Sequence, residues 1–178
     1  MTMADKVSAA GRAVIQRLTD REPVNYIEAG GLYGIVAQGR HNIALLSVLY
    51  NQARDSELRE LIKQSIDGLT QETVQRCEDL LQKGGAELPA AHFFSPQLEP
   101  RQDLPISVQL SAGEIAIAVA NIAKVSQTAL LAVLHQTYQP EIAIVLRTEL
   151  NNGLDWGYRM MQLMLHRGWL LHIAKVHH

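Results

Sequence analysis

A proline-bearing stretch divides this 178-residue chain into two pairs of helix-like segments, and this division constrains the fold more than any other feature. Residues 85–110, GAELPAAHFFSPQLEPRQDLPISVQL, carry four of the six prolines and show no lasting periodicity. So long a stretch inside a compact domain usually has a structural or functional role. In a helical bundle it serves as a crossover that lets the following helix run parallel to the preceding one. The only two phenylalanines, Phe93 and Phe94, are expected to hold the crossover against the helices.

The two segments before the crossover, 26–53 and 55–84, have apolar residues at spacings of three and four, which predicts two helices. Only a tight turn separates them, so we expect antiparallel neighbours. Four glycines weaken the first segment, and this has two interpretations. Either the glycines mark close approach of a neighbouring backbone, or the regular helix begins only near residue 40. The glycines are Gly30, Gly31, Gly34 and Gly39.

The two segments after the crossover, 111–138 and 140–167, also predict helices. The first opens on Ser111 and Glu114, which have the spacing of a capping box. It is apolar almost all round, which predicts a central helix or one covered by a second subunit. The second segment carries a ridge of apolar residues that we interpret as a wall of the core rather than a ligand site. The ridge consists of Leu146, Leu150, Leu154, Tyr158, Met161 and Leu165.

Together these segments predict an all-α fold, with residues 1–178 forming one four-helix bundle domain of ferritin-like type. The stretch around Val7, Val14 and Leu18 predicts a short additional helix at the N-terminus. Composition agrees, because 47% of the residues are hydrophobic and only 5% are aromatic.

The balance of charge predicts the environment of the chain. The formal net charge is −2, and basic residues are scattered among acidic ones, so we expect neither a nucleic-acid nor a membrane-surface partner. No stretch has the apolar core of a signal peptide, and no uninterrupted apolar run is long enough to span a membrane. The lone Cys77 has no partner for an internal disulfide and lies on an apolar stripe, which predicts a buried, inert thiol. We therefore expect a cytoplasmic chain.

The chain resembles a little-characterised ferritin-like family of spore-forming bacteria that is related to spore coat protein F. The resemblance rests on the helix entry NYIEAGGLY at 25–33, the junction GGAELP at 84–89, and the ending RGWL at 167–170. It spans Pro23 to Leu171. The relatives tend to have prolines after this point, where this chain has HIAKVHH. The resemblance implies a ferritin-like four-helix bundle, with spore association as the alternative to a cytoplasmic location, and no established activity.

A ferritin-like fold raises the question of metals, because its di-metal sites use two glutamates and two Glu-x-x-His pairs. No Glu-x-x-His occurs in this sequence. Counting residues from the turns places Asp67 and four candidate ligands near mid-bundle, too few carboxylates for two metals. The four candidate ligands of such a degenerate iron or manganese site are His41, Glu72, Glu149 and Asp155.

The remaining histidines and motifs give weaker signals. His135 and His166 lie near opposite ends of the bundle and are too far apart to share an ion. The tail histidines His172, His177 and His178 would form an incidental surface site rather than a functional one. The sequence GGLYG follows no strand and lacks the Lys-Ser/Thr ending of a phosphate loop. No Ser-His-Asp set can be nominated either, so no catalytic residue is predicted.

Two functions of different class follow from these observations. The first, which we favour, is a non-enzymatic bundle, coat-like in character, that acts through protein–protein contacts. It would self-associate, as a dimer, through the apolar helix 111–138, with Ile115, Val119 and Ile122 as candidate interface residues. The second is a degenerate ferritin-like protein that binds iron or manganese. A cavity for a small apolar ligand between the first and last helices is a third option, which the sequence neither supports nor excludes.

Overall fold

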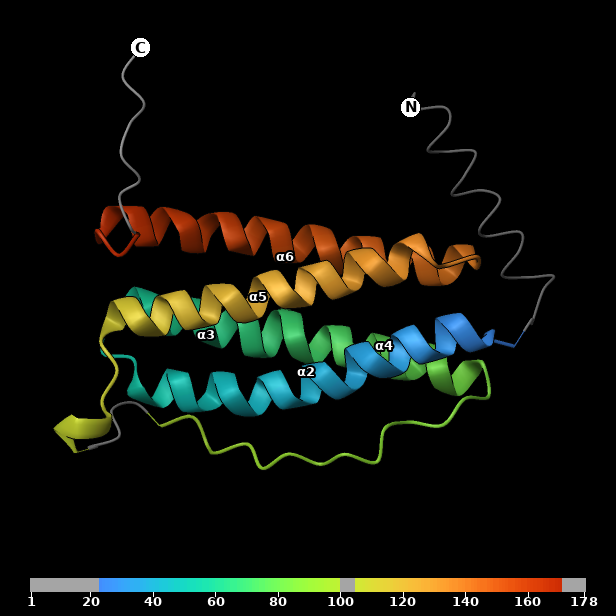
Figure 1. Cartoon of the computed structure of the whole chain (residues 1–178), viewed down its shortest axis with the longest axis horizontal. Coiled ribbons are helices and arrows are strands. Elements are labelled where there is room, and N and C mark those ends of the chain that lie inside the picture. The colour runs from blue at the N-terminus through green and yellow to red at the C-terminus, as the bar shows by residue number, and fades with distance from the viewer. Residues whose placement is uncertain (1–22, 100–104, 171–178) are drawn as a thin grey trace, which may run out of the picture.

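The computed structural model describes residues 23–99 and 105–170, which are all-helical and contain no strand (Figure 1). The predicted N-terminal helix and the tail histidines lie outside these ranges. A single π-helical stretch, η1, joins α3 to α4, so that α3, η1 and α4 form one continuous rod. The elements are α2 (Tyr26–Gln52), α3 (Ser56–Ser65), η1 (Ile66–Thr70), α4 (Gln71–Lys83), the short 3₁₀ turn η2 (Ile106–Val108), α5 (Ala112–His135) and α6 (Pro140–His166).

The four helical rods lie side by side, with the connections at the two ends (Figure 1). The α3–α4 rod runs antiparallel to α2, as the tight turn predicts. The segment after α4 then returns along the full length of the molecule, so that α5 starts beside the beginning of α3 and runs parallel to the α3–α4 rod. The predicted crossover is therefore confirmed. Helix α2 packs against α4 and α5, and α6 packs against α5 and α3.

Helix ends follow the predicted capping chemistry. The Asn25 side chain accepts hydrogen bonds from the backbone N–H groups of Ile27 and Glu28, both at 3.0 Å. Ser111 and Glu114 form the predicted capping box, in which each side chain pairs with the backbone of the other residue. These caps satisfy N–H groups that have no partner within the helix.

Backbone-directed hydrogen bonds from α2 hold the crossover in place. Arg40 donates to the carbonyl oxygens of Pro89, at 2.5 Å, and Ala91, at 3.3 Å. Further along α2, the Asn51 amide donates to the carbonyl of Gln97 and accepts from the N–H of Glu99, both at 2.8 Å. Two side chains of α2 thus fix a segment that has no regular structure of its own.

The phenylalanines contribute less to the crossover than predicted. The Phe93 ring meets the His41 ring edge-on, with ring centroids 5.1 Å apart. Phe94 is exposed to solvent, so the expectation that it pins the crossover is wrong. The hydrogen bonds of Arg40 and Asn51 with backbone groups hold the crossover instead. Such bonds are hard to predict from sequence, because every backbone carbonyl of the crossover is a possible acceptor.

Helix α2 is continuous from Tyr26, so the interpretation in which it begins near residue 40 is wrong. Two of its glycines instead allow close approach of neighbouring helices. A Cβ atom added at Gly31 would lie 2.6 Å from Val133 of α5, and one added at Gly39 would lie 2.4 Å from Val74 of α4.

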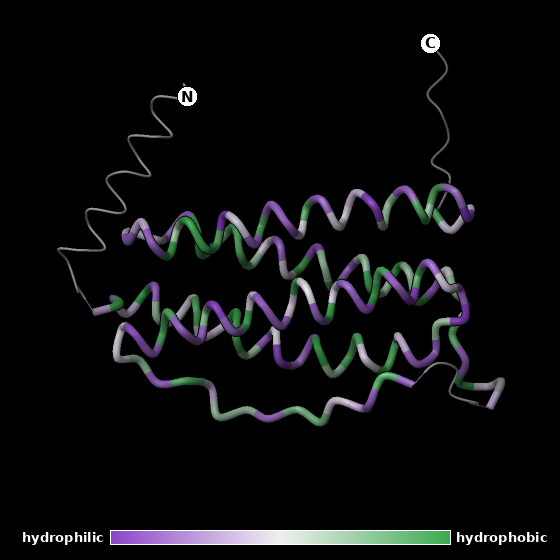
Figure 2. Tube along the Cα trace, turned by 180° about the vertical axis from the view of Figure 1, so that it is seen from behind, coloured by the Kyte–Doolittle hydropathy of each residue, from purple (hydrophilic) through white to green (hydrophobic). Residues whose placement is uncertain are grey.

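The apolar interior consists of two clusters, one toward each end of the molecule. Apolar segments recur along every helix in the hydropathy trace of Figure 2, as the spacing of three and four predicts. The first cluster contains Leu46, Leu58, Ile62, Ile115, Val119, Trp156, Met160 and Met164, among others. The second contains Leu32, Val36, Val74, Cys77, Leu81, Ile142 and Leu146, among others.

The predicted core ridge of α6 is only partly correct. Leu146 is buried, but Leu154, Tyr158, Met161 and Leu165 are between 41% and 60% exposed. The buried stripe of this part of α6 instead runs through Trp156, Met160, Leu163 and Met164. The two stripes have similar helical spacing, and spacing alone does not say which of them faces inward.

Candidate functional site

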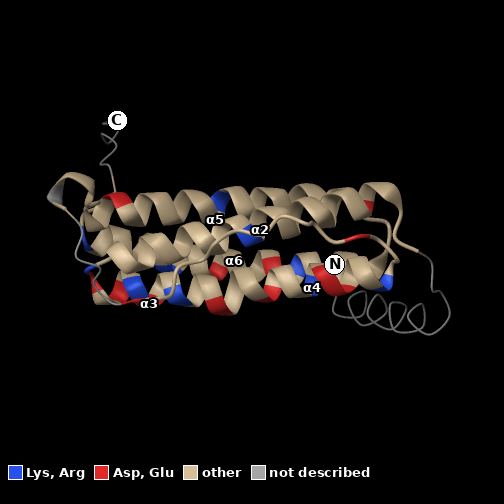
Figure 3. Ribbon diagram, turned by 90° about the horizontal axis from the view of Figure 1, so that it is seen from below, with Lys and Arg blue, Asp and Glu red and all other residues tan. Residues whose placement is uncertain are grey.

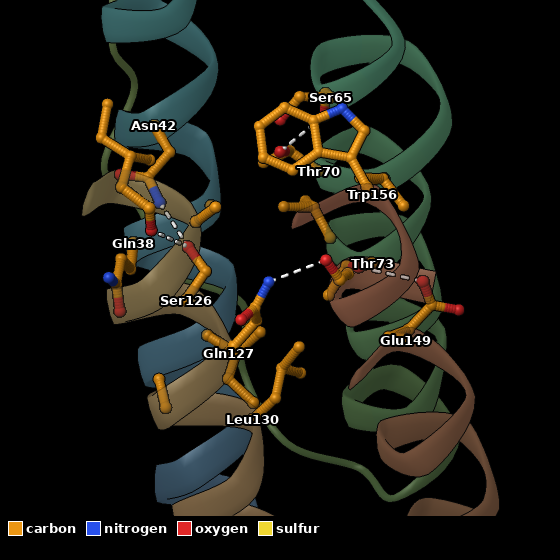
Figure 4. A pocket seen from close by; sticks show the side chains of 18 residues that line it. Gln38, Asn42, Ser65, Thr70, Thr73, Ser126, Gln127, Leu130, Glu149 and Trp156 are labelled. Carbon is orange, nitrogen blue, oxygen red and sulfur yellow. Dashed lines mark hydrogen bonds between the residues drawn. The ribbon is translucent and has the colours of Figure 1, made fainter. Parts of the chain in front are cut away.

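Between the two apolar clusters lies a layer of polar side chains, which we call the central layer. Every helical rod contributes to it, and the side chains converge on one cavity of about 70 Å³ (Figure 4). Apolar groups, including Leu130 and the Trp156 indole, complete the wall. The polar members are Gln38 and Asn42 of α2, Ser65 of α3, Thr70 of η1, Thr73 of α4, Ser126 and Gln127 of α5, and Glu149 of α6.

On the α2–α5 side of the cavity, the Asn42 amide donates to the Ser126 hydroxyl at 3.0 Å. That hydroxyl in turn donates to the Ile122 carbonyl of its own helix at 3.0 Å. On the other side, the Gln127 amide donates across to the Gly153 carbonyl of α6 at 2.7 Å (Figure 4). A Cβ atom added at Gly153 would lie 3.4 Å from the Gln127 side chain, an ordinary contact distance, so the amide lies directly against this part of α6.

The π-helical stretch η1 forms part of the cavity wall. Thr70 of η1 donates through its hydroxyl to the Ser65 carbonyl, five residues earlier, at 2.8 Å. Ser65 is itself buried, and its own hydroxyl makes no hydrogen bond within the described residues. Single π turns inside α-helices are frequent at functional sites, which makes the central layer a candidate site.

Glu149 is the one carboxylate of the central layer, and its side chain is 0% exposed. Thr73 donates to Oε2 at 3.1 Å. Arg76 Nη1 lies 2.8 Å from Oε1 but is not aligned to donate a directed hydrogen bond to it. Arg76 also lies 3.6 Å from Glu72 on its own helix. The negative charge of Glu149 is therefore compensated within the chain.

The structure does not bring the four candidate metal ligands together. Glu149 is buried, whereas His41, Glu72 and Asp155 are exposed, with His41 against Phe93 and Glu72 beside Arg76. Within residues 23–99 and 105–170, no group of three or more His, Cys, Asp or Glu side chains is arranged to hold a metal ion.

The candidate interface residues of α5 also lie elsewhere than expected. Ile115 and Val119 are completely buried in the first apolar cluster, so choosing them as contacts for a partner was wrong. Ile122 is partly buried and lines the central cavity. In a helix that is apolar all round, the sequence does not show which side the rest of the chain covers.

Exposed apolar residues of α5 and α6 form a second feature, which we call the apolar face. It consists of Ile117 and Leu131 of α5 and Leu154, Tyr158, Met161 and Leu165 of α6, between 40% and 60% exposed.

The register of α5 against α6 sets the level of these residues along the helix pair. Gln127 donates to Gly153, and Gly113 lies against the ring of Trp169, so the numbers of two residues at the same level add up to about 281. Ile117 therefore lies at the level of the end of α6, where Met161 and Leu165 are. The two rows belong to helices that pack against each other.

Helix α5 is long and apolar enough to cross a membrane by length and composition alone. Its most apolar 18-residue window has a mean hydropathy of 1.6, and only 11% of that window is buried. Ser126 and Gln127 of this helix point into the central layer and bond to it. Many of its other residues are partly buried, and Ile117, Val125 and Leu131 are exposed.

Cys77 is buried in the second apolar cluster, as predicted. Burial, together with the smaller effect of the nearby Glu149 and Glu78 carboxylates, raises the pKa of its thiol from 9.0 to about 12. A thiol with so high a pKa is not a nucleophile at neutral pH.

Sequence reasoning missed most of the central layer. Of the polar members it singled out only Glu149. Gln127 carried the available signal, because a polar residue within an apolar helix is expected to meet a partner inside the fold. Asn42, Ser65 and Ser126 give no comparable signal.

Comparison with known proteins finds a similar sequence and a similar fold. No family model matches the chain. The uncharacterized protein YvdQ of Bacillus subtilis (strain 168) is 24% identical over 160 residues, which cover 88% of this chain and 93% of that protein. A crystal structure from Bacillus halodurans C-125, described as that of a "putative spore coat protein", superposes with a TM-score of 0.80 at 20% identity, covering 88% of this chain and 97% of that one. The chain thus shares its all-helical fold with that spore coat-like protein.

Proposed function

We propose that this chain is a non-enzymatic, ferritin-like four-helix bundle that acts through protein–protein contacts, with a second copy of itself as its first partner. The observation that carries the proposal is the apolar face, which no described part of the chain covers. The likeness to the spore coat-like protein supports a role in a coat-type assembly.

The pattern of the apolar face favours a second copy as the occupant. On α6 its residues continue a 3-4 alternation, which is the spacing of a coiled-coil seam. Continuing toward the N-terminus, the seam passes through Asn151 and Arg147 to Ile144, which is also exposed. A polar Asn in such a seam fixes register and oligomeric state. A second copy presents the same seam, so a two-fold axis pairs it with itself.

The size of the face is compatible with a dimer. The seam from residue 144 to residue 165 is about 32 Å long at ~1.5 Å per residue. Two adjacent helices, each ~10 Å wide, give a footprint of roughly 640 Å². Stable interfaces bury about 800 Å² on each partner, and side-chain relief adds to the footprint.

Sedimentation equilibrium of the untagged chain tests this proposal. We expect a dimer at micromolar concentration. Tyr158→Glu, in the middle of the seam, should weaken it at least about 100-fold, since the dimer would bury an unpaired charge. Gln162→Glu adds the same charge to the same helix at an exposed position off the seam and should leave the dimer intact.

Several results would overturn the proposal. One is a wild-type chain that stays monomeric at protein concentrations about 100 times the expected micromolar dissociation constant. Another is an equal weakening of the dimer by both variants. A monomer that binds lipid vesicles through α5 would assign the face to a membrane instead. One or two iron or manganese ions per chain in the same sample would favour the metal-binding alternative.

A further inference from the structure

The central cavity has the composition of a binding site, and it is independent of the apolar face. It lies where four rods meet, between two well-packed apolar clusters. Burying polar groups there costs stability unless they find partners. The chain nevertheless gathers hydroxyl and amide groups around an open volume.

Several of these groups have unused hydrogen-bonding capacity. The Ser65 hydroxyl makes no hydrogen bond within the described residues, although only 6% of the residue is exposed. Asn42, also 6% exposed, uses its NH₂ group on Ser126, and its carbonyl oxygen accepts no hydrogen bond from the described residues. Gln127, which is partly buried, uses its NH₂ group on Gly153, and its carbonyl oxygen likewise has no donor in the described part of the chain. None of these oxygens is sealed off from solvent, so each can bond to a ligand or to water in the cavity.

The free atoms specify the chemistry of an occupant. Two amide oxygens accept only, and the serine hydroxyl accepts or donates, so the occupant must offer hydrogen-bond donors. Glu149 is already paired with Arg76, so no uncompensated charge faces the cavity. A charged occupant would lose its hydration without gaining an ion pair.

The apolar wall and the volume define the rest of the occupant. Trp156, Leu130 and Ile35 line the cavity beside the polar groups. Water would satisfy only the polar side of such a space. A cavity of about 70 Å³ is roughly half the size of one that holds benzene.

From these observations we propose that the central cavity is a binding site for a small neutral molecule of about four non-hydrogen atoms. Such a molecule carries a hydroxyl or carboxamide donor and a short apolar part. Its donor bonds to the Asn42 and Gln127 oxygens and to Ser65, and its apolar part lies against Trp156. A ligand of this size makes few contacts, so we expect affinities in the millimolar range.

Three probes with four non-hydrogen atoms each separate charge from size. Acetamide and propan-2-ol are neutral donors, whereas acetate is an anion of the same shape as acetamide. The chain has two tryptophans. In a Trp169→Phe background, fluorescence reports Trp156 alone. We expect saturable changes with acetamide and propan-2-ol and none with acetate.

Variants of the wall locate the binding. Ala123 lines the cavity, and Ala123→Leu should fill it and abolish the saturable change. Ala132→Leu, at an exposed position of the same helix, is the matched control and should bind as the wild type does. Ser65→Ala removes one hydrogen-bonding group and should weaken acetamide binding about 5-fold to 10-fold. If Ala123→Leu does not fold by circular dichroism, Ser65→Ala carries the test.

The proposal is overturned if neither neutral probe gives a saturable change, which would mean that the cavity holds water only. Equal binding of acetate and acetamide would overturn the neutral class. Unchanged binding in both Ala123→Leu and Ser65→Ala would place the probes elsewhere. None of these results depends on whether the chain dimerises.

Discussion

The two outer surfaces of this molecule differ sharply in how they use charge. The rod formed by α3, η1 and α4 carries ten charged residues between positions 56 and 83, whereas α5 carries only Glu114 and Lys124. Figure 3 shows the contrast, with charged residues gathered on α3 and α4 and few on α5.

The charges of the α3–α4 side are largely satisfied within the chain. Lys63 pairs with Asp67 one turn on, and Arg40 pairs with Glu78 at 2.9 Å. Arg167, after the end of α6, binds Asp55 at 3.0 Å and so joins α6 to the start of α3. Such a surface has little to gain from a partner, because a contact would first remove water from charges that are already paired.

The apolar face presents the opposite case. Covering it gains roughly 25 cal/mol for each Å² of apolar surface removed from water, with almost no charge to desolvate. The two surfaces therefore have different roles. One surface stabilises the fold, and we propose that the other binds a second chain. Substitutions on the two surfaces and in the interior test this difference, and their expected effects on the free energy of unfolding range from about 3 kcal/mol to less than ~0.5 kcal/mol.

The largest effect is expected where charge enters the interior. Arg76→Met removes the cation beside the buried Glu149. We expect it to lower the free energy of unfolding by about 2–3 kcal/mol, at the lower end for broken buried pairs because Arg76 is partly exposed. Urea denaturation measures the loss.

The control for this change is a double-mutant cycle. In a Glu149→Leu background the carboxylate is gone, so Arg76→Met should cost less than ~0.5 kcal/mol. An equal cost in both backgrounds would mean that Arg76 stabilises the chain by packing alone.

A smaller effect is expected at the start of α3. Asp55 caps this helix by accepting a hydrogen bond from the Leu58 N–H at 2.9 Å, and it also binds Arg167. Asp55→Ala loses both contacts and should cost about 1–2 kcal/mol. Asp55→Asn keeps the capping oxygen and loses the charge, so it should cost less. An Asn variant as destabilised as the Ala variant would contradict the capping role.

Asp55 also predicts that the free energy of unfolding falls at acidic pH. Burial opposes ionisation of Asp55, but hydrogen bonds from Leu58 and Arg167 outweigh it and lower the pKa of the carboxyl below 3.8. Its contribution to stability is therefore present above pH 3.8 and is lost as the pH falls through the lower pKa of the folded state. Asp55→Asn should flatten this part of the acid denaturation curve.

The buried thiol of Cys77 predicts that the free energy of unfolding falls at alkaline pH. Since burial raises the pKa of Cys77 from 9.0 to about 12, the folded chain keeps a proton that the unfolded chain loses. This contribution is full below pH 9 and declines as the pH rises toward 12, by about 1.4 kcal/mol at pH 10. Cys77→Ala should lose this slope between pH 9 and 11. An unchanged slope would show that other groups cause it.

The smallest effect on stability is expected on the apolar face. Leu154→Ser removes an exposed side chain and should change the unfolding free energy of the monomer by less than ~0.5 kcal/mol. It should weaken self-association nevertheless. Added salt should not weaken the association of the wild type, because few charges contribute to it. A salt-sensitive dimer would point to the charged surface instead.

Much of the fold could be predicted because local chemistry determines it. Asn25, Ser111 and Pro140 mark the starts of α2, α5 and α6, and the prolines after residue 88 identify the crossover. These signals depend on backbone geometry close in sequence. The direction in which a helix faces depends instead on what packs against it.

For that reason the inward-facing sides of α5 and α6 were predicted wrongly from the sequence. Both helices have more apolar surface than the core can cover, so Ile115 was expected outside and Tyr158 inside, and the structure reverses them. The cavity was equally inaccessible to sequence reasoning. Asn42, Ser65 and Gln127 come from three rods, and only the packed fold brings them together.

The central claim, that a second copy covers the apolar face, is tested most directly by methionine oxidation at increasing protein concentration. Met161 lies on the face, whereas its neighbour Met160 is buried in every state and serves as the internal standard. We predict that oxidation of Met161 slows as the concentration rises through the dimer dissociation constant, while Met160 stays protected throughout. A Met161 that is equally reactive from 1 to 100 times that concentration, in a sample that sediments as a dimer, would place the interface on another surface and contradict the account.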